Sequence, residues 1–100
     1  MLTALAAEPM HGYRIIQEVS ALSAGRVQLP VSTLYGALDR LAERHMIRVS
    51  REEVVDGRLR RYYALTDLGA EVLAVEAEQM RRNVHAATRR LRRFATGGLA

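Results

Sequence analysis

Apolar residues in the first half of the chain recur at intervals of three and four positions. This spacing is found in residues 2–7, 13–22 and 32–42, and it is typical of helices with one buried face. Glu8-Pro9 ends the first segment, and Gly25 marks a loop over residues 24–29. The pattern therefore predicts three short helices. The second is expected to bury one stripe, formed by Ile15, Ile16, Val19 and Leu22.

The third helix is the segment around which the rest of the chain is organised. Leu34, Leu38 and Leu41 form its apolar stripe, and Ser32, two residues after Pro30, is expected to cap its N-terminus. The opposite face carries small hydroxyls, an aromatic ring and an arginine, which can reach phosphates and base edges in a major groove. These candidate DNA-binding residues are Ser32, Thr33, Tyr35, Gly36 and Arg40. An ordinary solvated helix face is the alternative.

Beyond His45 the pattern changes from helix to strand. Residues 47–51 alternate, residues 61–65 are rich in strand-forming side chains, and Asp56-Gly57 between them predicts a two-residue hairpin turn. Three helices followed by such a hairpin predict a winged helix-turn-helix, with the third helix in the major groove and a basic hairpin beside it. The candidate contacts on the hairpin are Arg58, Arg60 and Arg61. A solvated hairpin tip is again the alternative.

A long helix is expected from Thr66, as N-cap, to about Phe94. An early stripe of Leu68, Val72 and Val75 is expected to pack on the winged core. A second set of apolar residues alternates four and three positions apart, as in helices that pack on a partner helix. No other segment of the sequence is left to cover this seam, so it predicts a dimer. The seam comprises Leu73, Ala77, Met80, Val84, Ala87, Leu91 and Phe94.

Composition narrows the function further. One domain of 100 residues has a net charge of +4, and all of its basic residues are arginine, which suits phosphate and guanine contacts. Cysteine is absent, so neither a disulfide framework nor a thiolate metal site is expected. The start of the chain lacks the features of a signal peptide and no apolar run reaches membrane-spanning length. We therefore expect a cytoplasmic protein without a membrane partner.

Catalytic and cofactor-binding motifs are missing from the sequence. His11, His45 and His85 are far apart, and there is no phosphate-binding loop or zinc motif. Glu52 and Glu53 are adjacent in a predicted strand and should point to opposite faces, so they cannot form a catalytic pair. We expect no enzyme activity, no cofactor and no metal. His11 is interpreted as a hydrogen-bonded junction residue, and Tyr13 and Tyr63 as packing residues.

Several short motifs, in order, resemble the PadR family of bacterial transcriptional regulators. They are His11-Gly12-Tyr13, Ser32-Thr33-Leu34-Tyr35, Gly57-Arg58, and residues 61–69, which read RYYALTDLG. The similarity covers roughly residues 2–93. It implies a winged-helix DNA-binding domain, a C-terminal helix that makes a homodimer, and repression relieved by a small molecule.

Three features depart from the family pattern. The chain starts inside what would be the first helix, and Leu59 stands where the family often has proline after Gly-Arg. A single helix follows the hairpin, as in the short branch of the family, so an effector site is expected between subunits or against the winged core. The candidate effector-binding residues are Leu5, Tyr13, Met80 and Val84.

Together these patterns predict a mainly α protein with a small β-hairpin: a winged helix-turn-helix over residues 1–66, a dimerisation helix over 67–95 and a flexible tail over 96–100. The expected function is that of a homodimeric repressor that binds an inverted-repeat operator in double-stranded DNA and is released by a small-molecule effector. The alternative is a winged-helix module that binds an acidic partner protein.

Overall fold

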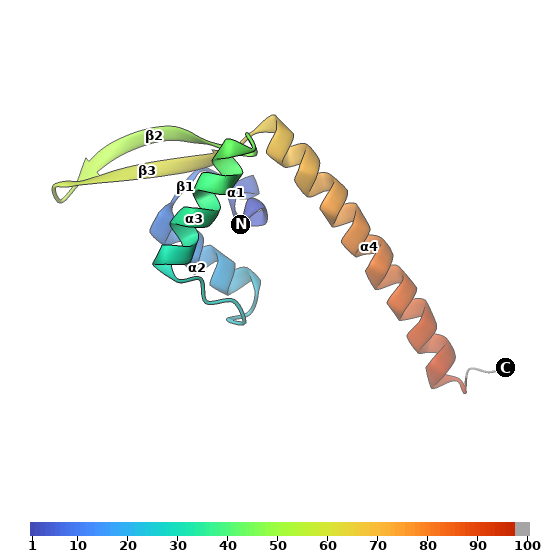
Figure 1. Cartoon of the computed structure of the whole chain (residues 1–100). Helices are drawn as coiled ribbons and strands as arrows, with labels where there is room; N and C mark the ends of the chain where they lie inside the picture. Colours follow the sequence, from blue (N-terminus) through green and yellow to red (C-terminus); the bar gives the residue numbers. More distant parts are fainter. Residues whose placement is uncertain (98–100) are drawn as a thin grey trace.

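The computed structural model describes residues 1–97 and begins with three helices and one short strand (Figure 1). In chain order these are α1 (Leu2–Ala7), β1 (Met10–His11), α2 (Gly12–Leu22) and α3 (Val31–Glu43). The three predicted helices are confirmed. His11 is also confirmed as a hydrogen-bonded junction residue, because its Nδ1 accepts a hydrogen bond from the backbone N–H of Arg14 at 3.4 Å and so caps α2.

The start of α3 differs from the prediction. Ser32 does not cap the helix; the N-cap is Pro30, and the helix begins at Val31 without a side-chain cap. The carbonyl of Pro30 accepts the first helical hydrogen bond, from Leu34 N–H at 2.9 Å. Proline suits this place because its fixed φ of −65° allows extended backbone immediately before the helix. Ser32 and Thr33 consequently lie inside the first turn.

The wing is an antiparallel hairpin formed by β2 (Ile47–Val55) and β3 (Arg58–Leu65). Its two-residue turn is the predicted Asp56-Gly57, with φ of 51° and 76°, as a hairpin turn of this length requires. The pairing shifts between Val49 and Arg51, which leaves a bulge in β2. The sequence did not predict β1, which pairs with β3 and gives the strand order β1-β3-β2.

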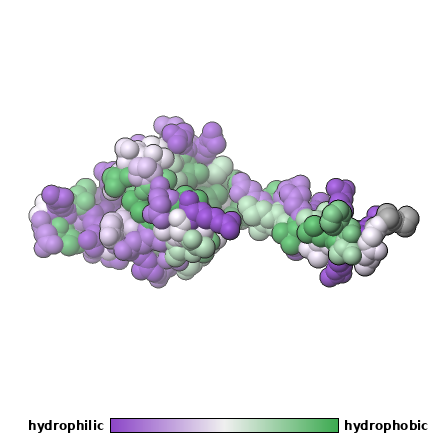
Figure 2. All heavy atoms as spheres, turned by 90° about the horizontal axis from the view of Figure 1, so that it is seen from below, coloured by the Kyte–Doolittle hydropathy of each residue, from purple (hydrophilic) through white to green (hydrophobic). Residues whose placement is uncertain are grey.

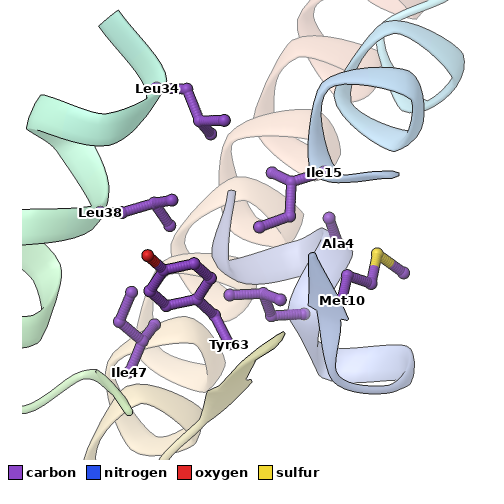
Figure 3. Close-up of a cluster of buried hydrophobic side chains, with 8 residues drawn as sticks. Ala4, Met10, Ile15, Leu34, Leu38, Ile47 and Tyr63 are labelled. Atoms are coloured by element: carbon purple, nitrogen blue, oxygen red, sulfur yellow. The ribbon is translucent and has the colours of Figure 1, made fainter. Parts of the chain in front are cut away.

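The core lies where α1, α2, α3 and the base of the hairpin meet, and Figure 3 shows its buried side chains pointing toward one another. Tyr63 enters this cluster from β3, which confirms its predicted packing role. Leu22, in contrast, is 57% exposed and does not continue the buried stripe of α2. The core residues are Ala4, Leu5, Met10, Ile15, Leu34, Leu38, Ile47 and Tyr63.

The last helix, α4 (Asp67–Ala95), leaves the winged core and projects away from it (Figure 1). Thr66 is its N-cap, as predicted, and accepts a hydrogen bond from Gly69 N–H at 3.0 Å. The early stripe was predicted to pack on the core, but Leu68 and Val75 are exposed because the helix diverges from the core within its first turns. Of the predicted tail, residues 98–100 lie outside the described part of the chain.

The resulting molecule has a head and a protruding helix, with extents of 67 × 27 × 20 Å. Within residues 1–97, no helix combines the length and the apolar character needed to cross a membrane. The fold therefore leaves two surfaces for function: the side of the head where α3 and the wing meet, and the faces of α4.

Candidate nucleic-acid interface

A groove of about 850 Å³ runs between the N-terminus of α2, the exposed face of α3 and the wing. Helix and hairpin line it from opposite sides. The lining residues include two exposed tyrosines, three arginines and a leucine, namely Tyr13, Tyr35, Arg58, Arg60, Arg61 and Leu59, together with His11, Gly12, Asp39, Val55, Asp56 and Tyr63. Of the predicted DNA-binding residues, Tyr35 and the three wing arginines line this concave surface, whereas Ser32, Thr33, Gly36 and Arg40 do not.

The α3 side of this surface is largely accessible to solvent. Ser32, Thr33, Tyr35 and Arg40 are exposed, and Gly36 is half-buried, so the five predicted residues share the outward face of the helix. Tyr35 reaches back toward α2: a Cβ added at Gly12 would lie 3.0 Å from the Tyr35 hydroxyl. The glycine at the start of α2 therefore leaves the space in which the Tyr35 ring lies.

The three wing arginines are not equivalent, although nothing in their sequence pattern separates them. Arg61 Nε lies 3.2 Å from a carboxylate oxygen of Glu52, and Arg60 lies 4.0 Å from Glu53. Arg58, next to the turn, forms no ion pair among residues 1–97. Its full positive charge is consequently available to a phosphate.

A cluster of side chains surrounds Tyr62, on the face of the hairpin opposite to that of Tyr63. The guanidinium of Arg51 lies 3.8 Å from the Tyr62 ring centroid, His11 meets the ring edge-on at 5.4 Å, and the Tyr62 hydroxyl donates to Glu53 at 2.6 Å. Burial lowers the pKa of His11, and the nearby charge of Arg60 lowers it further. His11 therefore favours the neutral form that its capping hydrogen bond needs.

The register confirms that Glu52 and Glu53 point to opposite faces, since Glu52 pairs with Arg61 and Glu53 with Arg60 across the strands. The two carboxylates each neutralise an arginine of the wing rather than acting together.

Tyr13 was interpreted as a packing residue, and this was wrong: its side chain is 67% exposed and lines the groove. The reason is visible in the spacing of α2, where the buried stripe starts at Ile15 and Tyr13 lies off it. Leu59 also lines the groove, although it was not predicted as part of any site. Its place beside Arg58 and Arg60 at the hairpin turn was the available signal.

The four candidate effector residues are not brought together within one chain. Leu5 is buried in the core, and Tyr13 lies in the groove. Met80 and Val84 are exposed on α4. A site shared by Tyr13, Met80 and Val84 would need a second copy of the chain, and the burial of Leu5 excludes it from such a site.

The predicted seam forms an uncovered apolar strip along α4. Leu73 is half-buried near the head, and the residues after it are exposed, reaching 83% exposure at Phe94. Figure 2 shows this hydrophobic surface on the outer part of the projecting helix. Near its end, a shallow apolar hollow is lined by Ala86, Ala87, Leu91 and Phe94, among others.

Sequence similarity places the chain in a known protein family. The Transcriptional regulator PadR-like family matches residues 1–75, which span the head and the start of α4. The chain belongs to the PadR-like family. The expected kinship and winged-helix fold are therefore confirmed, and the members of this family are transcription regulators rather than enzymes.

Two solved structures superpose on most of this chain. A PadR family transcription regulator from Clostridium difficile superposes with a TM-score of 0.73 at 23% identity, covering 90% of this chain and 92% of the other. A transcriptional regulator from Thermoplasma acidophilum gives a TM-score of 0.66 at 26% identity, covering 87% and 82%. At 23% identity, the similarity to the Clostridium difficile protein supports the fold alone.

Two curated sequences are related to this PadR-like chain. A protein of Lysinibacillus sphaericus is 36% identical over 64 residues, which is 64% of this chain and 59% of the relative. A 37.1 kDa protein in transposon TN4556 of Streptomyces fradiae is 40% identical over 82 residues, which is 82% of this chain and 22% of the relative. The chain thus spans less than two thirds of the length of either relative.

Proposed function

We propose that this PadR-like regulator is a homodimeric repressor that binds an inverted-repeat operator in double-stranded DNA. The observation that carries the proposal is the basic groove in which α3 and the wing face the same side. Major grooves admit a helix, and base edges are read there by hydroxyl, amide and guanidinium groups. In this arrangement residues 1–66 serve as the DNA-binding head and residues 67–95 as the dimerisation helix.

We assign different tasks to α3 and to the wing. Thr33 and Tyr35 lie in the first turns of α3, where a recognition helix contacts base edges. Ser32, Gly36 and Arg40 lie on the same face and would contact bases or flanking phosphates. The wing would contact the adjacent backbone and minor groove, with Arg58 as its most available charge and with Arg60 and Arg61 released in part from Glu53 and Glu52.

The seam on α4 supports a dimer because exposed apolar side chains continue along it from Met80 to Phe94. A helix of 29 residues is about 43 Å long, which provides room for several layers of packing. Dimerisation would bury this strip and pair two heads by a twofold axis, which is the symmetry that an inverted repeat matches.

Charges on α4 favour antiparallel packing of the two helices. Its acidic residues Asp67, Glu71, Glu76 and Glu78 precede Met80, and its arginines all follow Met80, at positions 81, 82, 89, 90, 92 and 93. Parallel helices would place both arginine clusters side by side. Antiparallel helices would place each cluster beside the partner's glutamates, and flanking charges of this kind set helix orientation.

We also propose that a small molecule releases the repressor from DNA, and this proposal rests on the seam of α4. Met80 and Val84 would line an effector site between the subunits, whereas Leu5 is buried inside the head. A screen of aromatic and cationic compounds tests this through the melting temperature and the DNA affinity of the protein. If no compound changes either quantity, the protein is a constitutive repressor.

Selection of bound duplexes from a random pool tests the central proposal. We expect enrichment of an inverted repeat, with affinity that falls steeply as salt rises. The alternative, a module that binds an acidic partner protein, predicts that salt weakens binding to any polyanion equally and that no sequence is enriched. A pool that remains random after several rounds at moderate salt would contradict operator recognition.

A further inference from the structure

Two exposed apolar side chains lie opposite each other near the tip of the wing. Val54 on β2 and Leu59 on β3 are cross-strand partners, and they are 72% and 57% exposed. Directly opposed residues project from the same face of a hairpin, so their side chains are neighbours. Figure 2 shows hydrophobic surface between hydrophilic atoms at the end of the molecule that the wing forms.

This pair belongs to the side of the wing that faces α3. Side chains alternate along a strand, so Leu59 and Arg61 share the face of Tyr63, whose ring enters the core. Leu59 also lines the groove together with Tyr35 of α3. A duplex that lies against α3 would therefore meet Leu59 when it reaches the wing.

Folding alone does not account for the exposure of these side chains. Both residues keep more than half of their surface exposed, and a cross-strand pair supports a hairpin only modestly. The surroundings of the pair are charged: Arg58 and Arg60 flank Leu59 in sequence, and Arg58 has no ion pair among the described residues. An apolar tip bordered by positive charge complements a groove bordered by phosphates.

We propose that Val54 and Leu59 form an apolar wedge that enters the minor groove of duplex DNA and partly opens one base step, while Arg58 and Arg60 contact the phosphates on either side. The inference rests on the proposed DNA-binding function and adds the way in which the wing distinguishes sequences. Apolar side chains are used in this manner by proteins that bend DNA through the minor groove.

An apolar wedge and a simple arginine contact predict preferences for different DNA sequences in the minor groove. Opening a step is easiest at flexible pyrimidine–purine steps such as TA, so a wedge favours alternating TA sequence. An inserted arginine is attracted instead to the narrow minor groove of a stiff A-tract. The two sequences contain the same base pairs and offer the same degenerate minor-groove acceptors, so the comparison isolates deformability.

The test compares binding of the full chain to two duplexes with identical G·C ends, one with an alternating TA centre and one with an A-tract centre. We expect the wild-type protein to bind the alternating duplex on the order of fivefold more tightly. A 2-aminopurine at the central steps should brighten when the protein binds, because an opened step relieves the quenching caused by stacking.

Variants at Leu59 test whether the preference for the alternating TA duplex depends on the apolar wedge. Leu59→Met retains apolar volume and should keep the preference and the fluorescence change, while Leu59→Ala should lose both. Leu59→Thr should also lose them with unchanged thermal unfolding, since threonine suits a strand. The matched control is Leu22→Ala, which removes an equally exposed leucine, at 57%, from the far end of α2.

The possible results separate the wedge from the function on which it rests. Failure to bind either duplex at low salt would contradict the DNA-binding function and the wedge with it. Binding to both duplexes with a preference for the A-tract, or with a preference that Leu59→Ala and Leu59→Thr both retain, would overturn the wedge alone.

Discussion

Gly69, in the first turn of α4, packs directly against the backbone carbonyl of Met46, which precedes β2. A Cβ at position 69 would clash with this carbonyl oxygen and would lie 2.7 Å from Cδ1 of Leu65. The same carbonyl accepts a hydrogen bond from Thr66 N–H at 3.0 Å. The start of α4 is thus fixed to the base of the wing by a contact that no side chain at position 69 can accommodate.

Gly69→Ala should therefore destabilise the protein. The carbonyl oxygen belongs to the backbone and cannot rotate away, so α4 must shift, at a cost of about 2 kcal/mol or more. Thermal unfolding at fixed protein concentration measures the effect. Gly36→Ala is the matched control, because its Cβ would meet Arg40 Nη1 at an ordinary 3.5 Å and removing a helical glycine stabilises by roughly 0.5–1 kcal/mol. Equal melting temperatures for the two variants would contradict the contact.

Gly12 and Tyr35 should be energetically coupled. Gly12→Ala places a methyl group 3.0 Å from the Tyr35 hydroxyl and 3.1 Å from Cδ2 of Leu34, and should cost about 1–2 kcal/mol of stability. Tyr35→Phe removes the hydroxyl, so the cost of Gly12→Ala should fall by on the order of 1 kcal/mol in that background. Denaturant unfolding of the four proteins gives the coupling. If the cost is the same in both backgrounds, Leu34 carries the contact instead of Tyr35.

The elements that the sequence predicts well are those with local signals. Thr66 caps α4, and Asp56-Gly57 forms the turn of the wing, because a capping hydroxyl and positive φ values depend on a few neighbouring residues. The prediction that Ser32 caps α3 was wrong, although a capping serine is also a local signal. Pro30 provides an extended backbone with its own φ restriction, so the helix starts before the serine.

Features that depend on distant parts of the chain could not be predicted in this way. β1 consists of two residues, Met10 and His11, and exists because β3 offers an edge to them. The exposure of Leu68 and Val75 follows from the direction in which α4 leaves the head, which periodicity does not define. Similarly, the pairing of Arg61 with Glu52 is a consequence of strand register.

Replacing Val84 and Leu91 with aspartate should give a monomer. Both are exposed in the single chain and lie on the seam of α4, where a dimer would bury two unpaired charges on each helix at high cost. Sedimentation measures the mass. His85→Asp introduces the same side chain next to Val84 at an exposed position off the seam and should leave the dimer intact. A double variant that sediments with the mass of the wild-type protein would show that the seam is not the interface.

The wing and α3 should contribute differently to DNA binding, and within the wing Arg58 should matter more than Arg61. Arg58→Ala should weaken binding to every duplex and lower the salt slope by about one for each phosphate that a subunit no longer neutralises. Arg61→Ala should have a smaller effect, since Glu52 already neutralises part of its charge at 3.2 Å. Thr33→Ala and Tyr35→Phe should cost roughly 1–3 kcal/mol at the selected operator and far less on random duplex, because their side chains are placed to read base edges.

The measurement is the ratio of specific to non-specific affinity for each variant at matched salt. Glu52→Gln adds a check on the ion pair: it releases Arg61 and should tighten binding to random duplex without changing that ratio. If Arg58→Ala removes the preference for the operator while Thr33→Ala and Tyr35→Phe retain it, the roles are reversed and sequence is read by the wing. Since Arg58 is the wing arginine nearest the turn and lacks a carboxylate partner among residues 1–97, we expect its replacement to lower both affinities by the same factor.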